Sequence, residues 1–463
     1  MKSKMFQIVL GLVLILSLVL AGCSPAPTAA PAAPAAATKA SAPAPAATTV
    51  DPVAALAALE GKVFSTGPNG ETPTAASEVV LSADELAKIK GMNATAAIVM
   101  HYAGNDWSNA QVAGLKAQFE AMGIKVIAVT DAGFKPEKQV SDIETVMALK
   151  PNIIVSIPTD PVATSAAYKS AAAAGVKLVF MDNVPAEMTQ GKDYVSVVSA
   201  DNYGNGVAAA HLMAKSIGSA GKIGVIYHEA DFFVTKQRYE AFKKTIADNY
   251  PNIEMVEEQG ITGPDFAGDA EKAASAMMTK HADLKGIWAV WDVPAEGVMA
   301  AARAMGRDKD LVITTIDLGL NAAIEIAKGG MIKGLGAQRP FDQGVTEALL
   351  AGYGLLDKPA PAYVALYMLP VDLSNILDAW KIVYHADPPA DLVAAKKKLI
   401  FHLYALPGGA IHRGEQPGSY LVEQRLSRIK KTTRALLTMA IVSKQTWPPG
   451  TKVTQIEFRL AGW

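Results

Sequence analysis

Short apolar segments alternate with helical periodicity along most of this chain, and that alternation restricts the fold more than any other feature of the sequence. The first set of apolar segments is at 96–102, 125–131, 152–158, 176–182 and 194–199, with helical spacing at 109–122, 136–150 and 161–174. The second set is at 222–228, 254–258, 286–292, 311–317 and 332–338, with helical spacing at 235–250, 268–281, 294–305 and 320–328. Strands that alternate with helices of this length form parallel sheets covered on both faces. The sequence therefore predicts an α/β protein with two doubly wound parallel-sheet lobes.

The first 23 residues have the pattern of a secretory signal peptide. Lys2 and Lys4 precede an apolar run over 8–20, which is short for a membrane span. The segment Leu20-Ala21-Gly22-Cys23 resembles a bacterial lipobox, whose cysteine is lipidated and becomes the mature N-terminus. An ordinary signal peptide with a chance cysteine is the alternative, but Cys23 is the only cysteine of the chain and has no disulfide partner. We expect Cys23 to anchor the protein on the extracytoplasmic side of a membrane of the cell envelope.

Residues 24–50 are built almost entirely from Pro, Ala, Ser and Thr. Such a segment has little to bury and behaves as an extended or disordered linker. We expect it to be a tether between the lipid and a folded body. Residues 51–93 form an N-terminal extension, in which Ser82 and Glu85 have the spacing of a capping box that starts a short helix packed on the first lobe.

The formal net charge of −1 gives no electrostatic reason to expect nucleic acid as a partner. The charge is unevenly distributed along the chain. Residues 393–463 are strongly basic, since they contain twelve Lys and Arg residues, three Glu and no Asp. Two interpretations of this tail stay open. It is either a segment that contacts an anionic membrane surface, or sequence carried past the natural end of the protein by a frameshift or a gene-model error. Before it, residues 375–389 have the pattern of an amphipathic helix closed by prolines.

Polar and aromatic side chains follow the predicted strands of both sets. In doubly wound sheets ligands bind beyond the carboxyl ends of the strands, so these residues form the candidate site. Carboxylates accept hydrogen bonds from neighbouring hydroxyls, amides and cations donate them, and aromatic rings cover the C–H faces of a sugar. The mixture suits a sugar or another polyol. The candidate ligand-binding residues are Asn105, Trp107, Asp182, Asn183, Lys236, Phe266, Trp291, Asp292, Asp317 and Gln338.

Each candidate also has a purely structural interpretation. Asp317 could be no more than a helix N-cap, and Trp107 could simply cap its lobe. Trp288 and Trp291 are three residues apart, so they face opposite ways in a strand, and we assign Trp288 to the core. Lys236 precedes Arg238 and is nearer the strand end, so we prefer Lys236 as the ligand contact.

From about residue 96 to 389 the chain resembles periplasmic sugar-binding proteins of the ribose-binding type, the substrate-binding components of ABC importers. The resemblance rests on Asn105-Asp106-Trp107, Phe180-Met181-Asp182-Asn183, the segment from Lys236 to Phe242, Phe266, Trp291-Asp292, Asp317 and Gln338. Ribose binders usually have Arg at the position of Asn183, Arg at that of Lys236 and Asn at that of Trp291. These departures point away from ribose itself but leave a polar, hydroxylated ligand.

The resemblance implies a type I periplasmic-binding-protein fold, in which the chain crosses between the lobes three times, here at 199–202, 338–341 and 359–363. The first lobe is then 94–200 with 340–361, and the second is 201–339 with 362–392. The resemblance further implies that the lobes close on a sugar or polyol and that an ABC permease with its ATPase reads the closed form. We expect a monomer.

Other classes of function fit the sequence less well. A repressor of the same fold would need a DNA-binding headpiece where this chain has a signal and tether. No full P-loop, nucleophile elbow or metal-ligand spacing of histidines is present in the sequence, so we expect no enzyme, no catalytic residue, no metal and no cofactor. Two alternatives share the site: a binder of a nucleoside or signalling molecule, and a ligand sensor that feeds a chemotaxis or sensor receptor.

Overall fold

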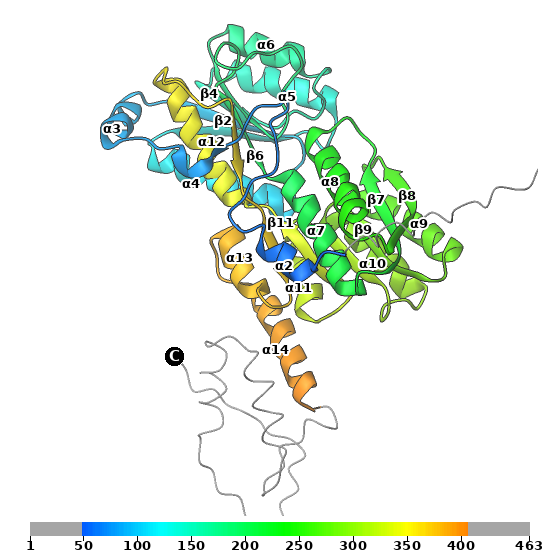
Figure 1. The fold of residues 1–463 in the computed structure, drawn as a ribbon. Coiled ribbons are helices and arrows are strands. Elements are labelled where there is room, and N and C mark those ends of the chain that lie inside the picture. The colour runs from blue at the N-terminus through cyan, green and yellow to red at the C-terminus, as the bar shows by residue number, and fades with distance from the viewer. Residues whose placement is uncertain (1–48, 406–463) are drawn as a thin grey trace, which may run out of the picture. The chain divides into compact units, whose positions relative to one another are not determined.

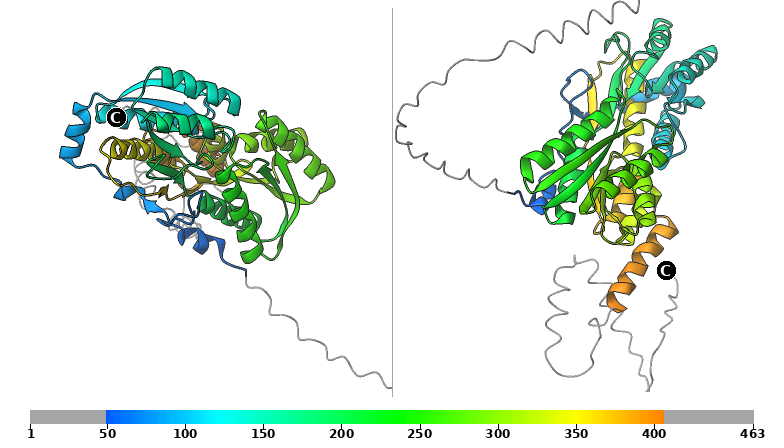
Figure 2. Two further views of the ribbon diagram at one scale, coloured as in Figure 1. Left: turned by 90° about the horizontal axis from the view of Figure 1, so that it is seen from above. Right: turned by 90° about the vertical axis from the view of Figure 1, so that its right-hand side faces the viewer.

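The computed structural model describes residues 49–405, and these contain two β-sheets flanked by helices (Figures 1 and 2). The first sheet has seven parallel strands in the order β1-β12-β6-β5-β4-β2-β3. They are β1 (Thr74–Ala75), β2 (Thr95–Met100), β3 (Lys125–Asp131), β4 (Ile153–Ser156), β5 (Lys177–Met181), β6 (Ser196–Ala200) and β12 (Tyr363–Leu366). The predicted doubly wound α/β class is confirmed.

The second sheet has six strands in the order β13-β11-β10-β9-β7-β8, and only its edge strand β13 is antiparallel to its neighbour. Its strands are β7 (Gly221–His228), β8 (Ile253–Ile261), β9 (Leu284–Ala289), β10 (Val312–Ile316), β11 (Ile332–Ala337) and β13 (Leu369–Asp372). Both sheets lie within one unit of the chain, Thr48–Trp463.

Most helices follow the strands in alternation. Those of the first lobe are α3 (Ala83–Gly91), α4 (Asp106–Ala121), α5 (Pro136–Ala148), α6 (Ser165–Ala173) and α12 (Pro340–Leu355). Those on the second sheet are α7 (Asn202–Ile217), α8 (Phe233–Asn249), α9 (Phe266–Lys280), α10 (Asp292–Ala304), α11 (Leu320–Ala327), α13 (Ile376–Tyr384) and α14 (Ala390–Ala405). The N-terminal extension adds α2 (Pro52–Ala57) and the 3-10 turn η1 (Ala76–Glu78).

Burial on both faces explains why the strands appear as continuous apolar runs. In β2, Ile98 and Met100 lie in one hydrophobic cluster, whereas Ala97 and Val99 between them lie in another. Alternate residues of a strand point to opposite faces, so both faces of this strand are covered by core. The same arrangement places the carboxyl ends of the parallel strands at one edge of each sheet.

The chain passes between the sheets at three places. After β6 it enters α7, which packs on β10 and β11, and after β11 it enters α12, which packs on α4 and β5. The third passage lies between Leu366 and Leu369, later than the predicted 359–363. The reason is that β12 pairs in parallel with β6 and therefore belongs to the first sheet. The first lobe thus ends near residue 366 rather than 361.

The N-terminal extension contacts both lobes (Figure 1), and its helix α3, which we predicted to pack on the first lobe, buries Ile89 in the core of that lobe. Its α2 packs on α7 of the second lobe, and β1 pairs with β12 at the edge of the first sheet. Between them, the backbone N–H groups of Phe64 and Ser65 each donate to the carboxylate of Asp201 at 2.9 Å. Asp201 is fully buried at the first passage between the lobes. We call this extension, residues 51–93, the strap. The predicted capping box of Ser82 and Glu85 is present at the start of α3.

Helix α14 changes the predicted C-terminal boundary. The tail was expected to begin at 393, but α14 runs from Ala390 to Ala405 and leads away from the second sheet (Figure 2). Leu392 and Ala395 are buried in the core cluster of the second lobe. The predicted boundary therefore falls inside a packed helix. The signal peptide, Cys23, nearly all of the tether and residues 406–463 lie outside the described residues. Within 49–405, none of the helices combines the length and the hydropathy that crossing a membrane requires.

Candidate functional site

A cavity of about 100 Å³ lies between the two lobes, at the carboxyl ends of both sheets. That is several times the space that one water molecule needs. Its polar lining consists of Asn105, Asp182, Thr235, Arg238, Asp317 and Gln338. Its rings are His101, Tyr102, Trp107, Phe134, His228, Phe232, Phe266 and Trp291, and Ile157, Val234, Pro264 and Val293 complete it.

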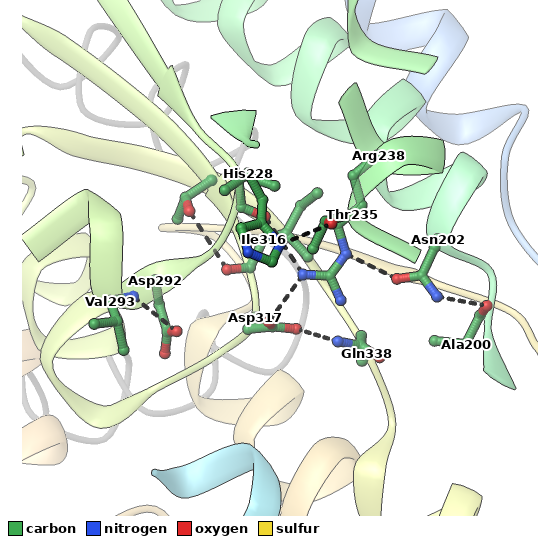
Figure 3. A network of polar contacts seen from close by, with 12 residues as sticks. Ala200, Asn202, His228, Thr235, Arg238, Asp292, Val293, Ile316, Asp317 and Gln338 are labelled. Carbon is green, nitrogen blue, oxygen red and sulfur yellow. Dashed lines mark hydrogen bonds and ion pairs between the residues drawn. The ribbon is translucent and has the colours of Figure 1, made fainter. Parts of the chain in front are cut away.

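Arg238 organises the polar end of the cavity (Figure 3). Its guanidinium is buried and donates from Nε to Asn202 Oδ1 at 2.8 Å and from Nη1 to Asp317 Oδ2 at 3.3 Å. Gln338 Nε2 donates to the other oxygen of Asp317 at 2.6 Å. A buried arginine is stable only with such partners. The carboxylate, guanidinium and amide are therefore held in fixed positions toward the cavity.

Both strand-end aspartates of the site have left-handed backbone conformations. The φ angle is 56° at Asp182, which follows β5, and 70° at Asp317, which follows β10. Such angles are uncommon for non-glycine residues and occur mostly in turns and at functional sites. The N-cap of α11 is Gly319, so Asp317 is not the helix cap that the sequence allowed. Its carboxylate instead faces Arg238 and Gln338.

Burial raises the pKa of Asp182 to about 6, against the lowering effects of Ser199 and Arg238. Ser199 Oγ donates to Asp182 Oδ1 at 2.6 Å, and Gln343 Nε2 donates to the same oxygen at 3.3 Å. The second oxygen, Oδ2, is the one left for a ligand hydroxyl. Asp182 consequently changes its protonation state near neutral pH.

A cluster of rings from both lobes also lines the cavity. His101 lies over Phe232 of the other lobe with a centroid separation of 5.8 Å, and Phe134 meets Phe266 edge-on at 5.4 Å. Phe266 in turn meets Trp291 at 4.9 Å. Such contacts stabilise packed rings beyond the area that they bury. The rings close the cavity and leave flat apolar faces toward its interior.

Two histidines lie within this ring cluster and are uncharged at neutral pH. Burial lowers the pKa of His101 to about 3, with a smaller effect of His228. Burial and the nearby Arg238 lower the pKa of His228 to about 4. His228 Nδ1 pairs with Thr235 Oγ1 at 3.1 Å, whereas His101 Nδ1 is buried without a partner among the described residues. Each ring therefore offers neutral donor and acceptor atoms and no positive charge.

Most predicted site residues line the cavity, but Lys236, Asn183 and Asp292 do not. Lys236 is exposed, and Arg238, our second choice, lies in its place. Helix α8 begins at Phe233, and residues two apart on a helix point about 200° apart, so only one of the two cations can face the cleft. Asn183 is buried beneath the site, where its amide donates to the Pro158 carbonyl at 3.1 Å.

Asp292 is buried at the start of α10, where its Oδ1 accepts the Val293 N–H at 2.9 Å. Burial, together with Asp317 and Glu296, raises the pKa of its carboxyl well above the ordinary value. Asn105 is also the N-cap of α4. Trp288 is buried in the core, as predicted, and stacks on Phe242.

Sequence reasoning missed several lining residues, although some carried a usable signal. His101 and His228 stand at the ends of predicted strands, where the rule that located Asp317 applies equally. Phe134 and Phe232 are in the loops that follow β3 and β7. Within residues 49–405 there is no cluster of three or more His, Cys, Asp or Glu side chains that could hold a metal ion.

Comparison with known proteins agrees with this geometry. Residues 96–353 match the family described as periplasmic binding protein domain. The chain belongs to the periplasmic binding protein family. It is similar to the ribose import binding protein RbsB of Bacillus subtilis, with 30% identity over 230 residues, which is 49% of this chain and 70% of that protein. It is also similar to the D-apiose import binding protein of Paraburkholderia graminis, with 24% identity over 220 residues, 47% of this chain and 67% of that protein.

A solved structure with the same fold is an ABC transporter solute binding protein from Agrobacterium vitis, bound with alpha-D-tagatopyranose. Its TM-score is 0.58 at 23% identity, and the alignment covers 63% of this chain and 99% of that one. These relatives are binding proteins rather than enzymes. This periplasmic binding protein thus has the type I fold that the sequence resemblance implied, with a cavity at the carboxyl ends of its strands.

Proposed function

We propose that this periplasmic binding protein captures an uncharged sugar or sugar-like polyol between its lobes and delivers it to an ABC importer. The observation that carries the proposal is the presence of a fixed hydrogen-bonding group, made by Arg238, Asp317 and Gln338, together with a set of aromatic rings in one cavity. The hydroxyl groups of a sugar need hydrogen-bonding partners, and the C–H faces of its ring pack on aromatic rings. The names of similar proteins, which include ribose and D-apiose import binding proteins, support the same class of ligand.

Charge balance favours an uncharged ligand. The only cation that lines the cavity within the described residues is Arg238, and it is paired with Asp317. Both lining histidines are neutral at pH 7, since burial holds the pKa of each far below neutrality. A sugar acid or a sugar phosphate would bring a negative charge that no lining group is free to neutralise, and desolvating such a charge is costly. Neutral hydroxyls meet no such penalty.

The proposal includes the location of the protein in the cell envelope. Lipidation of Cys23 and the linker over 24–50 would keep the loaded protein near its permease on the extracytoplasmic side of the membrane. Metabolic labelling with a radioactive fatty acid tests this: the wild-type chain should be labelled and a Cys23→Ala variant should not. Equal labelling of both would contradict the anchor.

Calorimetry with a panel of ligands tests the binding function. The panel contains D-ribose, D-allose, D-tagatose and allitol as neutral members, and glucuronate and ribose 5-phosphate as charged ones. At least one neutral member should bind at micromolar Kd or better, about −8 kcal/mol, and the charged ones should not. Trp107 and Trp291 line the cavity, so binding should also change tryptophan fluorescence. Failure of every neutral sugar and polyol would refute the ligand class.

The ring cluster favours one second candidate, a nucleoside. Eight rings, including two neutral imidazoles, surround the cavity, and a heteroaromatic base could stack on them while its ribose meets Asp317. Adenosine and uridine in the same calorimetric panel decide between the two. Tight binding of a nucleoside without binding of any free sugar would replace the first proposal with this one.

A further inference from the structure

One hydrogen bond joins the two lobes at the rim of the cleft, outside the cavity lining. Asp106 is the first residue of α4 in the first lobe, and Leu320 is the first residue of α11 in the second. The Leu320 N–H donates to Asp106 Oδ2 at 2.7 Å, across 214 positions of sequence. Asp106 does not line the cavity, although its neighbours Asn105 and Trp107 do. The contact therefore connects the lobes without involving the ligand.

Helix α11 has no cap of its own. Its N-cap residue is Gly319, which has no side chain to accept a hydrogen bond, and its first turn contains no acidic residue. The first N–H groups of any helix need acceptors from outside the helix, and a carboxylate there also benefits from the helix dipole. A Ser or Asp at the N-cap position ordinarily supplies this acceptor. Here Asp106 supplies it from the opposite lobe.

The surroundings of Gly319 keep this helix end open to Asp106. A Cβ atom at position 319 would lie 2.0 Å from Asp292 Oδ2 and 3.6 Å from Asp106 Oδ2. Any larger residue would collide with Asp292 and displace the start of α11. Burial and acidic neighbours, Asp106 among them, raise the pKa of Asp292 and so favour its protonated form.

We propose that Asp106 is a positioning residue for ligand capture: it caps α11 across the cleft and so stabilises the closed form, whichever ligand is bound. This inference rests on the proposed function. Opening about the three passages between the lobes would separate α4 from α11 and break the bond, while hydrogen bonds within each lobe would persist. Because apparent affinity scales with the fraction of protein in the closed, competent form, loss of the cap weakens every ligand by the same factor.

The test compares Asp106→Ala, Asp106→Asn and Ser82→Ala in the full-length protein. Ser82 caps α3, and both partners of that bond are in the strap, so its loss removes a helix cap that does not cross the cleft. Asp106→Ala should weaken every ligand about fivefold, the effect of one helix cap, mainly through faster dissociation. Asp106→Asn keeps an acceptor and should restore most of the affinity. Ser82→Ala should leave affinity unchanged.

A ligand-free measurement separates this inference from the proposed function. Spin labels on Val162→Cys and Met305→Cys, exposed positions in different lobes, report the distance between the lobes on a Cys23→Ser background. Asp106→Ala should shift the distribution toward longer distances without any ligand. Unchanged distances together with wild-type dissociation rates would overturn the proposed role of Asp106. So would a loss of affinity confined to one ligand. If no ligand binds the wild type, the proposed function fails, and the distances between the lobes alone decide whether Asp106 stabilises the closed form.

Discussion

Asp201 holds the strap to the hinge, and its replacement should be among the most destabilising single changes in the protein. Its Oδ1 accepts hydrogen bonds from the N–H of Gly204 and from both the N–H and Oγ of Ser65, each at 2.9 Å. Its Oδ2 accepts the Phe64 N–H, also at 2.9 Å. A single buried carboxylate thus caps α7 and fastens the strap between the lobes.

The size of the effect follows from these bonds. Loss of the α7 cap costs about 1 kcal/mol, and each hydrogen bond to a charged acceptor contributes about 1.5–3 kcal/mol. Removing the carboxylate also removes the cost of burying it, since burial raises the pKa of Asp201 above its usual value. The bonds alone would give roughly 5–10 kcal/mol, and the recovered burial cost offsets part of this, so we expect Asp201→Ala to lower the free energy of unfolding by about 3–4 kcal/mol. Asp201→Asn keeps the acceptor Oδ1 but places an amide nitrogen opposite the Phe64 N–H. The free energy of unfolding should therefore fall by only about 1–2 kcal/mol.

Urea unfolding, followed by both tryptophan fluorescence and far-UV circular dichroism, measures these changes and shows whether the transition is two-state. Asp265→Ala is the matched control, because Asp265 caps α9 through the Gly268 N–H at 3.0 Å and is not bonded to the strap. It should cost about 1 kcal/mol. The reasoning would be refuted if Asp201→Ala cost no more than Asp265→Ala, or if the Ala and Asn variants of Asp201 were equally unstable.

Three further predictions concern the site and the C-terminal helix. Arg238→Met should weaken ligand binding about 100-fold, because it removes a charged donor and frees Asp317, whereas Lys236→Met should leave calorimetric affinity unchanged. Since burial raises the pKa of Asp182 to about 6, its carboxylate becomes a weaker acceptor as pH falls through 6. Affinity should therefore drop between pH 7.5 and 5 in the wild type and stay flat in Asp182→Asn. A chain truncated after residue 392 should have a lower melting temperature than one truncated after 405, because it lacks Ala395 of the second lobe's core.

The strands were predictable because burial on both faces makes each one a short apolar run. Burial also explains why hydrophobic periodicity did not predict the helices α7 and α12. Residues on nearly every side of α7 are buried, among them Gly206, Ala209 and Leu212, so no polar face alternates with an apolar one. Strands β12 and β13 have four residues each and depend on their partners. No local pattern indicates that β12 lies beside β6 of the first sheet.

The site was predictable to the extent that position along a strand determines it. Asp182, Asp317 and Gln338 follow their strands directly, and the structure places all three in the cavity. The choice between Lys236 and Arg238 depended instead on the phase of α8, which a two-residue error in the helix start reverses. The rule of strand ends located residues that line the cavity, but it does not give the direction in which a helical side chain points.

The polar network also explains why this site should respond to the relative position of the lobes. From Asp182 in the first lobe, hydrogen bonds run through Ser199 and Asn202 to Arg238 and then to Asp317 in the second. Ser199 and Asn202 flank the first passage between the lobes, so rotation there changes the same bonds that orient Arg238. A ligand that bonds to both Asp182 and Asp317 would fix both ends of this chain. Under the proposed function, closure and recognition would be coupled through this set of buried hydrogen bonds. A change at Asn202 should then alter affinity without any contact to the ligand.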